Sequence, residues 1–123
     1  MAKYTSPESH RSRLEAERAD LLEEIERLRS LLKTDTDAST QEGDPDIYER
    51  EKTMAFLEQA QARLDAVERA LRLIEQGQYG LCERCGQPIE PERLEALLDA
   101  TLCMKCQSEV ERLSARARRG LLP

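Results

Sequence analysis

Two pairs of cysteines constrain the fold of this chain more than any other feature of its sequence. In each pair two residues separate the members, and residues 86–102 separate the pairs. The cysteines are Cys82, Cys85, Cys103 and Cys106, and the chain has no others. A two-residue spacer lets one tight turn direct both thiols at a common centre, and two such turns at this separation match four-thiolate zinc sites. We therefore predict one zinc ion bound by these residues within a subdomain over 78–123.

The zinc is expected to be structural. Four protein thiolates fill a tetrahedral ion and leave no position for a reactive water, and the binding energy then supports a small core. A redox C-x-x-C pair is the alternative, but it needs a low-pKa thiolate in a βαβ fold that this sequence does not indicate. Disulfides are not expected, because the N-terminus carries charge rather than the apolar core of an export signal. We therefore expect a cytoplasmic protein.

Two long helices are predicted upstream of the cysteines, at about 7–33 and 45–76. Ser6 and Asp44 are suitable N-caps, each followed by a proline, and Gly77 suits the position after the second helix. Apolar residues recur in each helix at steps of three, four or seven, as in a coiled coil. The first seam consists of Leu14, Leu21, Ile25, Leu28 and Leu32, and the second of Leu57, Ala60, Leu64, Val67, Leu71 and Ile74.

Each stripe is too narrow to stabilise a lone helix, so it must be buried against a partner. The connection is only about a dozen residues long, so we predict a long antiparallel coiled-coil hairpin over residues 1–77. Short and C-terminal helices are expected at 91–100 and 104–119. With 3% aromatic residues, five glycines and five prolines, the composition favours an all-α fold.

The predicted tip of the hairpin, residues 34–44, is acidic. Between Thr34 and Asp46 there is no basic residue, and the acidic residues are Asp35, Asp37, Glu42, Asp44 and Asp46. One interpretation is a solvated loop with helix caps. The other is a probe that delivers carboxylates, which are ligands for Mg²⁺, to a remote site. The pattern alone leaves both open.

Several function classes are disfavoured. The net charge of −6 argues against general attraction to nucleic acid, and no apolar stretch is long enough for a membrane span. His10 is the only histidine, and we expect it at the surface of a charged helix. No nucleophile set can be assembled around it, and no glycine-rich phosphate loop is present. We therefore do not expect an enzyme.

Two segments resemble the DksA/TraR family. They are residues 70–86, ALRLIEQGQYGLCERCG, and residues 89–106, IEPERLEALLDATLCMKC. The resemblance implies a bacterial transcription regulator that binds RNA polymerase through its secondary channel, with no sequence-specific binding to DNA. It implies that the acidic tip acts near the catalytic Mg²⁺ and modulates initiation. We expect such a chain to act as a monomer.

The chain departs from the family pattern at the tip and at the alarmone site. The family's tip has two aspartates separated by two residues, then an alanine two positions on. Alignment places Asp37 on the second aspartate, but Thr34 on the first and Ser39 on the alanine, with Asp35 as a possible substitute. The family positions that bind guanosine tetraphosphate correspond to Ala66, Leu97 and Gln107, so we expect weak dependence on this alarmone.

Two other functions remain as alternatives. A zinc-ribbon protein that binds nucleic acid needs a basic face with stacking aromatic residues, which this composition does not favour. A purely structural coiled-coil adaptor would use zinc only to fasten the base of the hairpin. Competition with transcript-cleavage factors for polymerase separates this adaptor from a channel-binding regulator.

Overall fold

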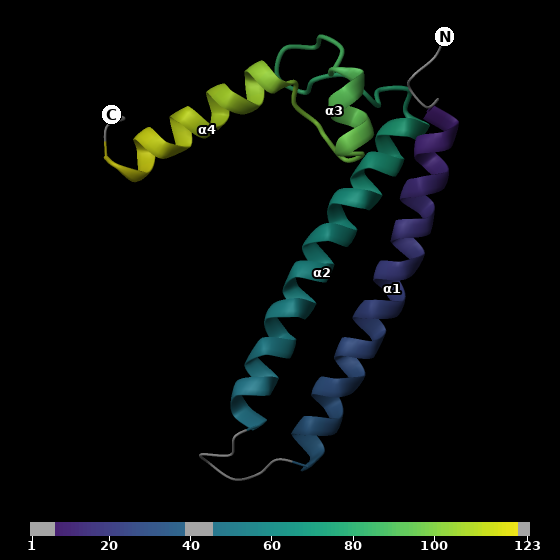
Figure 1. Cartoon of the computed structure of the whole chain (residues 1–123), viewed down its shortest axis with the longest axis vertical. Helices are drawn as coiled ribbons and strands as arrows, with labels where there is room; N and C mark the ends of the chain where they lie inside the picture. The colour runs from purple at the N-terminus through teal and green to yellow at the C-terminus, as the bar shows by residue number, and fades with distance from the viewer. Residues whose placement is uncertain (1–6, 39–45, 121–123) are drawn as a thin grey trace. The chain divides into compact units, whose positions relative to one another are not determined.

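The computed structural model describes residues 7–38 and 46–120, with side chains described over 8–34 and 47–120. These two ranges contain four helices, α1 (Pro7–Ala38), α2 (Asp46–Glu75), α3 (Pro91–Ala96) and α4 (Met104–Arg118) (Figure 1). Within these ranges no strand forms, and one isolated bridge pairs Leu81 with Pro88. The predicted all-α class is confirmed. Of the helices described, none combines the length and the apolar character that a membrane span requires.

The chain divides into two compact units. One comprises Arg13–Glu68, and the other combines Met1–Ser12 with Arg69–Pro123. This division follows spatial contacts and passes through both long helices. The domains expected at 1–77 and 78–123 follow the order of the chain and stay a prediction.

The unit over 13–68 is an antiparallel pair of helices, with α1 and α2 side by side (Figure 1). Its core combines residues of both predicted seams. Ile25, Leu28 and Ala60 are buried, and Leu21, Leu57 and Leu64 pack against them. Ion pairs cross between the helices beside this core. The Arg63 guanidinium donates two hydrogen bonds to the Glu17 carboxylate, of 2.6 and 2.9 Å, and Arg18 donates one of 3.0 Å to Glu68.

The end of α2 is a Schellman motif. Gln78 N–H donates to the Leu73 carbonyl at 2.9 Å and Gly77 N–H to the Ile74 carbonyl at 3.1 Å. Gly77 has a φ of 72°, the left-handed conformation that this motif places after a helix. The predicted role of Gly77 is therefore confirmed.

Two other helix ends differ from those predicted. Helix α1 continues to Ala38 instead of ending near residue 33, and α3 stops at Ala96 instead of residue 100. The polar run after Lys33 contains no proline or glycine before Gly43, so nothing in it forces the helix to stop. In α3, the last turn closes when Leu97 N–H donates to the Arg93 carbonyl at 2.7 Å.

Candidate metal centre

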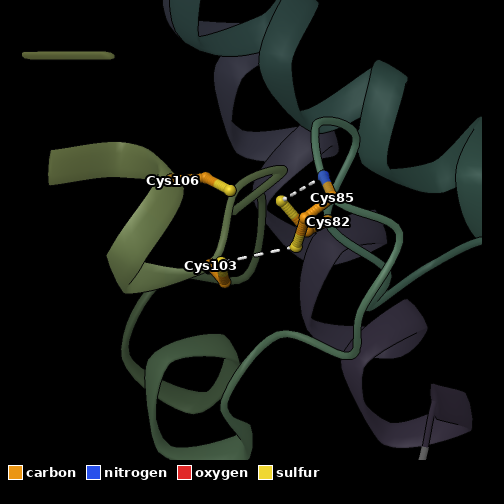
Figure 2. A group of neighbouring side chains, drawn as sticks. All are labelled: Cys82, Cys85, Cys103 and Cys106. Atoms are coloured by element: carbon orange, nitrogen blue, oxygen red, sulfur yellow. Dashed lines mark hydrogen bonds between the residues drawn. The ribbon is translucent and has the colours of Figure 1, made fainter. Parts of the chain in front are cut away.

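The four cysteines converge in the unit that contains residues 69–123. Cys82 and Cys85 lie in the turn enclosed by the Leu81–Pro88 bridge, whereas Cys103 is the N-cap residue of α4 and Cys106 lies in its first turn. Their Sγ atoms all lie within 4.8 Å of one another. Figure 2 shows the side chains directed toward a common centre from these two segments. The structure thus brings together all four predicted ligands.

The spacing of the sulfurs fits a tetrahedral zinc ion. The Cys85 and Cys103 Sγ atoms are 3.8 Å apart. With Zn–S bonds of about 2.3 Å, the edge of a regular tetrahedron of sulfurs is about 3.8 Å. This site therefore needs little rearrangement to accept zinc.

The first pair is held by a tight turn. Gly86 N–H donates to the Cys82 carbonyl at 2.9 Å, and Cys85 N–H points at the Cys82 Sγ at 3.5 Å. Gly86 has a φ of 77°, which a residue with a side chain rarely adopts. Gly86 therefore lets the backbone curl directly behind the second sulfur.

Backbone and side-chain hydrogen bonds position the second pair beside the first. Glu83 N–H donates to the Thr101 carbonyl at 2.8 Å, which joins the two cysteine-bearing segments. The Glu90 carboxylate accepts a hydrogen bond of 3.2 Å from Met104 N–H at the start of α4. A carboxylate there satisfies a backbone donor that the first helical turn leaves free.

Most of the centre is shielded from solvent. Cys82, Cys103 and Cys106 are buried with Ile89 and Ala100, and Leu94 and Leu102 pack against this cluster. Cys85, in contrast, is exposed. Two ion pairs lie around this cluster, one between Arg84 and Glu109 and the other between Arg69 and Glu83. The Glu109 carboxylate raises the pKa of Arg84.

The thiols lie in contrasting electrostatic environments. Burial alone would raise the pKa of Cys82, but hydrogen bonds from the backbone of Cys103, Cys85 and Arg84 outweigh it and lower this pKa to about 6. Burial, followed by hydrogen bonds to the neighbouring thiols, raises the pKa of Cys106 to about 12. With the pKa of Cys106 this high, all four sulfurs become thiolates together only when a bound cation neutralises them, as zinc does in a four-thiolate site.

The structure corrects the expectation for His10, which is buried with 4% of its surface exposed. Its Nε2 lies 3.0 Å from the Glu95 carboxylate, and its Nδ1 lies 3.2 Å from the Tyr79 hydroxyl. The same hydroxyl donates to the Leu98 carbonyl at 2.8 Å. These partners are distant in sequence, so the charged residues around His10 gave no signal of its burial.

The predicted tip residues are described only in part. Asp35 and Asp37 are among the last residues of α1, but their side chains lie outside the residues whose side chains are described. Ser39, Glu42 and Asp44 lie outside the described residues altogether. The role assigned to the tip therefore stays a prediction.

Comparisons with known proteins agree with this geometry. Residues 77–112 match the sequence model of the prokaryotic DksA/TraR C4-type zinc finger. An uncharacterised protein of Aquifex aeolicus is 49% identical over 53 residues, which make up 43% of this chain and 37% of that protein. The RNA polymerase-binding transcription factor DksA of Caulobacter vibrioides is 43% identical over 49 residues, or 40% of this chain and 34% of that protein.

The likeness in three dimensions extends further along the chain. The solved structure of transcription factor DksA2 from Pseudomonas aeruginosa matches with a TM-score of 0.76 at 27% identity, over 89% of this chain and 85% of that one. The matches to the two curated relatives, in contrast, span only 37% and 34% of their length. The resemblance to the DksA/TraR family is confirmed: residues 77–112 match its C4-type zinc finger, and the four close cysteines within them indicate one structural zinc ion.

Proposed function

We propose that this chain is a bacterial transcription regulator that binds RNA polymerase through the secondary channel and modulates initiation. The observation that carries the proposal is the fold match to transcription factor DksA2, which extends over 89% of the chain and so includes more than the zinc finger. Further support comes from the relative in Caulobacter vibrioides, which is named as an RNA polymerase-binding transcription factor. On this proposal the chain acts in the cytoplasm, as a monomer and without catalysis of its own.

Within this proposal, the paired helices are the part that enters the channel. The α2 helix has 30 residues and is about 45 Å long, enough to reach well into a large enzyme. Antiparallel packing makes the pair stiffer than a single helix. Asp35 and Asp37 at the end of α1 would then supply negative charge close to the catalytic Mg²⁺, where carboxylates can act on the ion or on its other ligands.

Cys82, Cys85, Cys103 and Cys106 are the proposed zinc ligands. Zinc with four thiolates has no open coordination position, so its contribution is to hold the two cysteine-bearing segments together. Two hydrogen bonds support this role, one between the Glu83 and Thr101 backbones and one from Met104 N–H to the Glu90 carboxylate at the start of α4.

Weak dependence on guanosine tetraphosphate is also part of the proposal. None of the aligned residues Ala66, Leu97 and Gln107 carries a positive charge for its phosphates. Leu97 is exposed, and the Gln107 amide donates to the Glu111 carboxylate at 2.8 Å. A carboxylate beside Gln107 makes this position unfavourable for an anion.

The test is a binding titration of fluorescently labelled chain with purified core polymerase. We expect saturable binding, displacement by a transcript-cleavage factor that occupies the secondary channel, and an affinity that changes less than about threefold with guanosine tetraphosphate. Binding that the cleavage factor does not displace would identify an adaptor that binds elsewhere on polymerase. The absence of binding would refute the proposed function.

A further inference from the structure

Charge is distributed unevenly between the two compact units. The unit over 13–68 has 16 acidic and 8 basic residues, whereas the unit that combines 1–12 with 69–123 has 9 acidic and 11 basic residues. The whole excess of negative charge therefore belongs to the first of these units. The net charge of −6 argues against attraction to nucleic acid for the chain as a whole, but it does not describe the unit that contains α4.

One face of α4 carries a row of four basic side chains, which we call the basic stripe. Each residue advances about 100° around a helix, so these four side chains point within about 60° of one another. The stripe is about 21 Å long, nearly the whole length of α4. Its members, all of them exposed, are Lys105, Arg112, Arg116 and Arg119.

No carboxylate of α4 neutralises the basic stripe. The helix has two acidic residues, and both have other partners. Glu109 forms an ion pair with Arg84, and the Glu111 carboxylate accepts a hydrogen bond of 2.8 Å from the Gln107 amide. Within the part of the chain that the structure describes, the side chains of the stripe make no ion pair or hydrogen bond. Their charges are therefore available to an anionic partner.

The helix dipole accounts for only part of the basic stripe. Cations stabilise the last turn of a helix, which explains Arg116 and Arg119 at the end of α4. Lys105 lies in the first turn, where a cation is unfavourable, and Arg112 lies between the two ends. In addition, Arg112 and Arg116 are like charges four residues apart, which destabilise a helix. A bound polyanion would relieve both costs.

The residues around the basic stripe favour nucleic acid over protein as this partner. On the same face lie Ser108, Glu109 and Ala115, none of which has a large apolar side chain. Protein interfaces depend on buried apolar and aromatic anchors, whereas interfaces with DNA are more polar and much more positively charged. Arginine also matches phosphate geometry, because its guanidinium can donate two parallel hydrogen bonds.

Duplex DNA fits this face better than a single strand. Proteins bind single strands by stacking the bases on aromatic side chains. Residues 69–123 contain one aromatic residue, Tyr79, and its ring packs against His10. Duplex DNA needs no stacking partner, and with one charge per about 1.7 Å of its axis it is the denser polyanion.

We propose that the basic stripe of α4 binds the phosphate backbone of duplex DNA without reading its sequence. The three arginines donate hydrogen bonds to phosphate oxygens, and Lys105 adds a fourth positive charge. The inference goes beyond the proposed function and does not depend on it, since it uses only residues of α4 and of the unit around it.

The test is a fluorescence anisotropy titration of a labelled duplex with the zinc-loaded full-length chain. In about 50 mM salt we expect saturable binding to a duplex of about 20 base pairs, with affinities within about twofold for unrelated sequences. Four neutralised phosphates predict a slope of about −3.6 when the logarithm of the binding constant is plotted against that of the salt concentration. One strand of the duplex alone should bind more weakly.

A pair of variants separates the basic stripe from overall charge. Arg112→Gln removes one charge from the stripe, and Arg118→Gln is the matched control, because Arg118 is exposed on α4 but points about 120° away from Arg112. We expect Arg112→Gln to weaken binding about fivefold and to bring the salt slope about 0.9 closer to zero. Arg118→Gln should change the affinity less than about twofold and keep the slope. Circular dichroism should show the same helix content for both.

Equal effects of these two variants would mean that only overall charge matters, and this result would overturn the inference. Absence of duplex binding by the parent chain, or tighter binding to the single strand, would also overturn it. If the triple variant Arg112→Gln, Arg116→Gln, Arg119→Gln binds the duplex normally but loses affinity for polymerase, the partner of the stripe is an acidic protein surface and the inference is wrong. In each of these cases the polymerase titration of the parent chain still decides the proposed function separately.

Discussion

His10 connects three parts of one compact unit. It lies on α1 and contacts Tyr79, in the segment after α2, and Glu95 on α3. The Tyr79 ring also meets the imidazole edge to face, with centroids 5.8 Å apart. Because the imidazole is buried, its polar atoms depend on these partners rather than on water.

We predict that His10→Ala lowers the free energy of unfolding by about 2 kcal/mol. The change removes the hydrogen-bonding partner of Tyr79 and Glu95, and it leaves a cavity where the buried imidazole ring lay. Urea denaturation followed by circular dichroism measures the effect. Arg29→Ala, on the exposed surface of the same helix, is the control and should change stability by less than about 0.5 kcal/mol. An equal effect of the two changes would contradict this role for His10.

Gly80 offers a second test at the residue scale. It has a φ of 85°, and a Cβ at this position would lie 3.3 Å from the Leu94 Cδ1. Gly80→Ala should therefore lower the free energy of unfolding by about 1–2 kcal/mol, because alanine is strained in the left-handed conformation. The need to displace the Leu94 side chain should lower it further. Gly77→Ala is a matched control, since Gly77 has a φ of 72° and open space where a Cβ would lie. Thermal unfolding should show a larger loss of stability for Gly80→Ala, and the reverse order would refute the steric argument.

The cysteines were predictable from sequence and His10 was not, for a physical reason. Spacing within a C-x-x-C pair is local, and it already determines that one turn can direct both sulfurs at a metal. The burial of His10 depends on Glu95, 85 residues away along the chain. No local pattern contains such a contact.

At the scale of the helices, Ala60 sets how closely α1 and α2 pack. It is buried against Ile25 and Leu28 in the core of the helix pair. Ala60→Leu should destabilise the chain by about 1–3 kcal/mol, because the added carbons need space that the facing helix occupies. Ala55→Leu makes the same change on the exposed side of α2 and should be close to neutral. Chemical denaturation of both variants distinguishes overpacking from a general effect of leucine.

Removal of zinc tests the metal centre as a structural element. We expect a strong chelator to unfold residues around the four cysteines first, because three of these cysteines belong to the core of that region. Hydrogen exchange should then rise over residues 78–119 while the α1–α2 core over 21–64 stays protected. Unchanged exchange and an unchanged thermal midpoint after zinc loss would contradict a structural role.

The helices were easier to predict than their ends. Leu14, Ile25, Leu28 and Val67, all placed in the predicted seams, are buried. Periodicity reveals these residues because a buried stripe must recur with the turn of the helix. The end of α1 at Ala38 was missed because its polar last residues resemble a loop in composition, although none of them breaks a helix.

For the molecule as a whole, binding and regulation should be separable at the tip. Asp35→Asn with Asp37→Asn should leave the affinity for polymerase within about twofold but abolish the effect on initiation. The reason is that these changes remove the proposed effector charges and keep the helix. In vitro transcription beside the binding titration measures both quantities. Asp20→Asn with Asp65→Asn removes the same charge from exposed positions elsewhere and should retain regulation. Normal regulation by the Asp35/Asp37 variant would exclude the tip as the effector.

The general architecture could be predicted from the sequence, because two helices with apolar stripes and a short connection have few ways to bury those stripes. An antiparallel hairpin is the arrangement that buries both seams with a dozen-residue link. Function did not follow in the same way. The acidic run at 34–46 was compatible with a plain solvated loop, and only the motifs around the cysteines connected it to polymerase.

The compact unit that contains His10 is assembled from segments at both ends of the chain, residues up to Ser12 and from Arg69 onward. This affects the order of events on the ribosome. The α1–α2 core can form as soon as residue 68 has emerged, whereas the first turns of α1 must wait for Tyr79, Glu95 and Leu98 to be translated. Nascent chains stalled before residue 95 should therefore leave His10 accessible to diethyl pyrocarbonate, and the full-length protein should protect it.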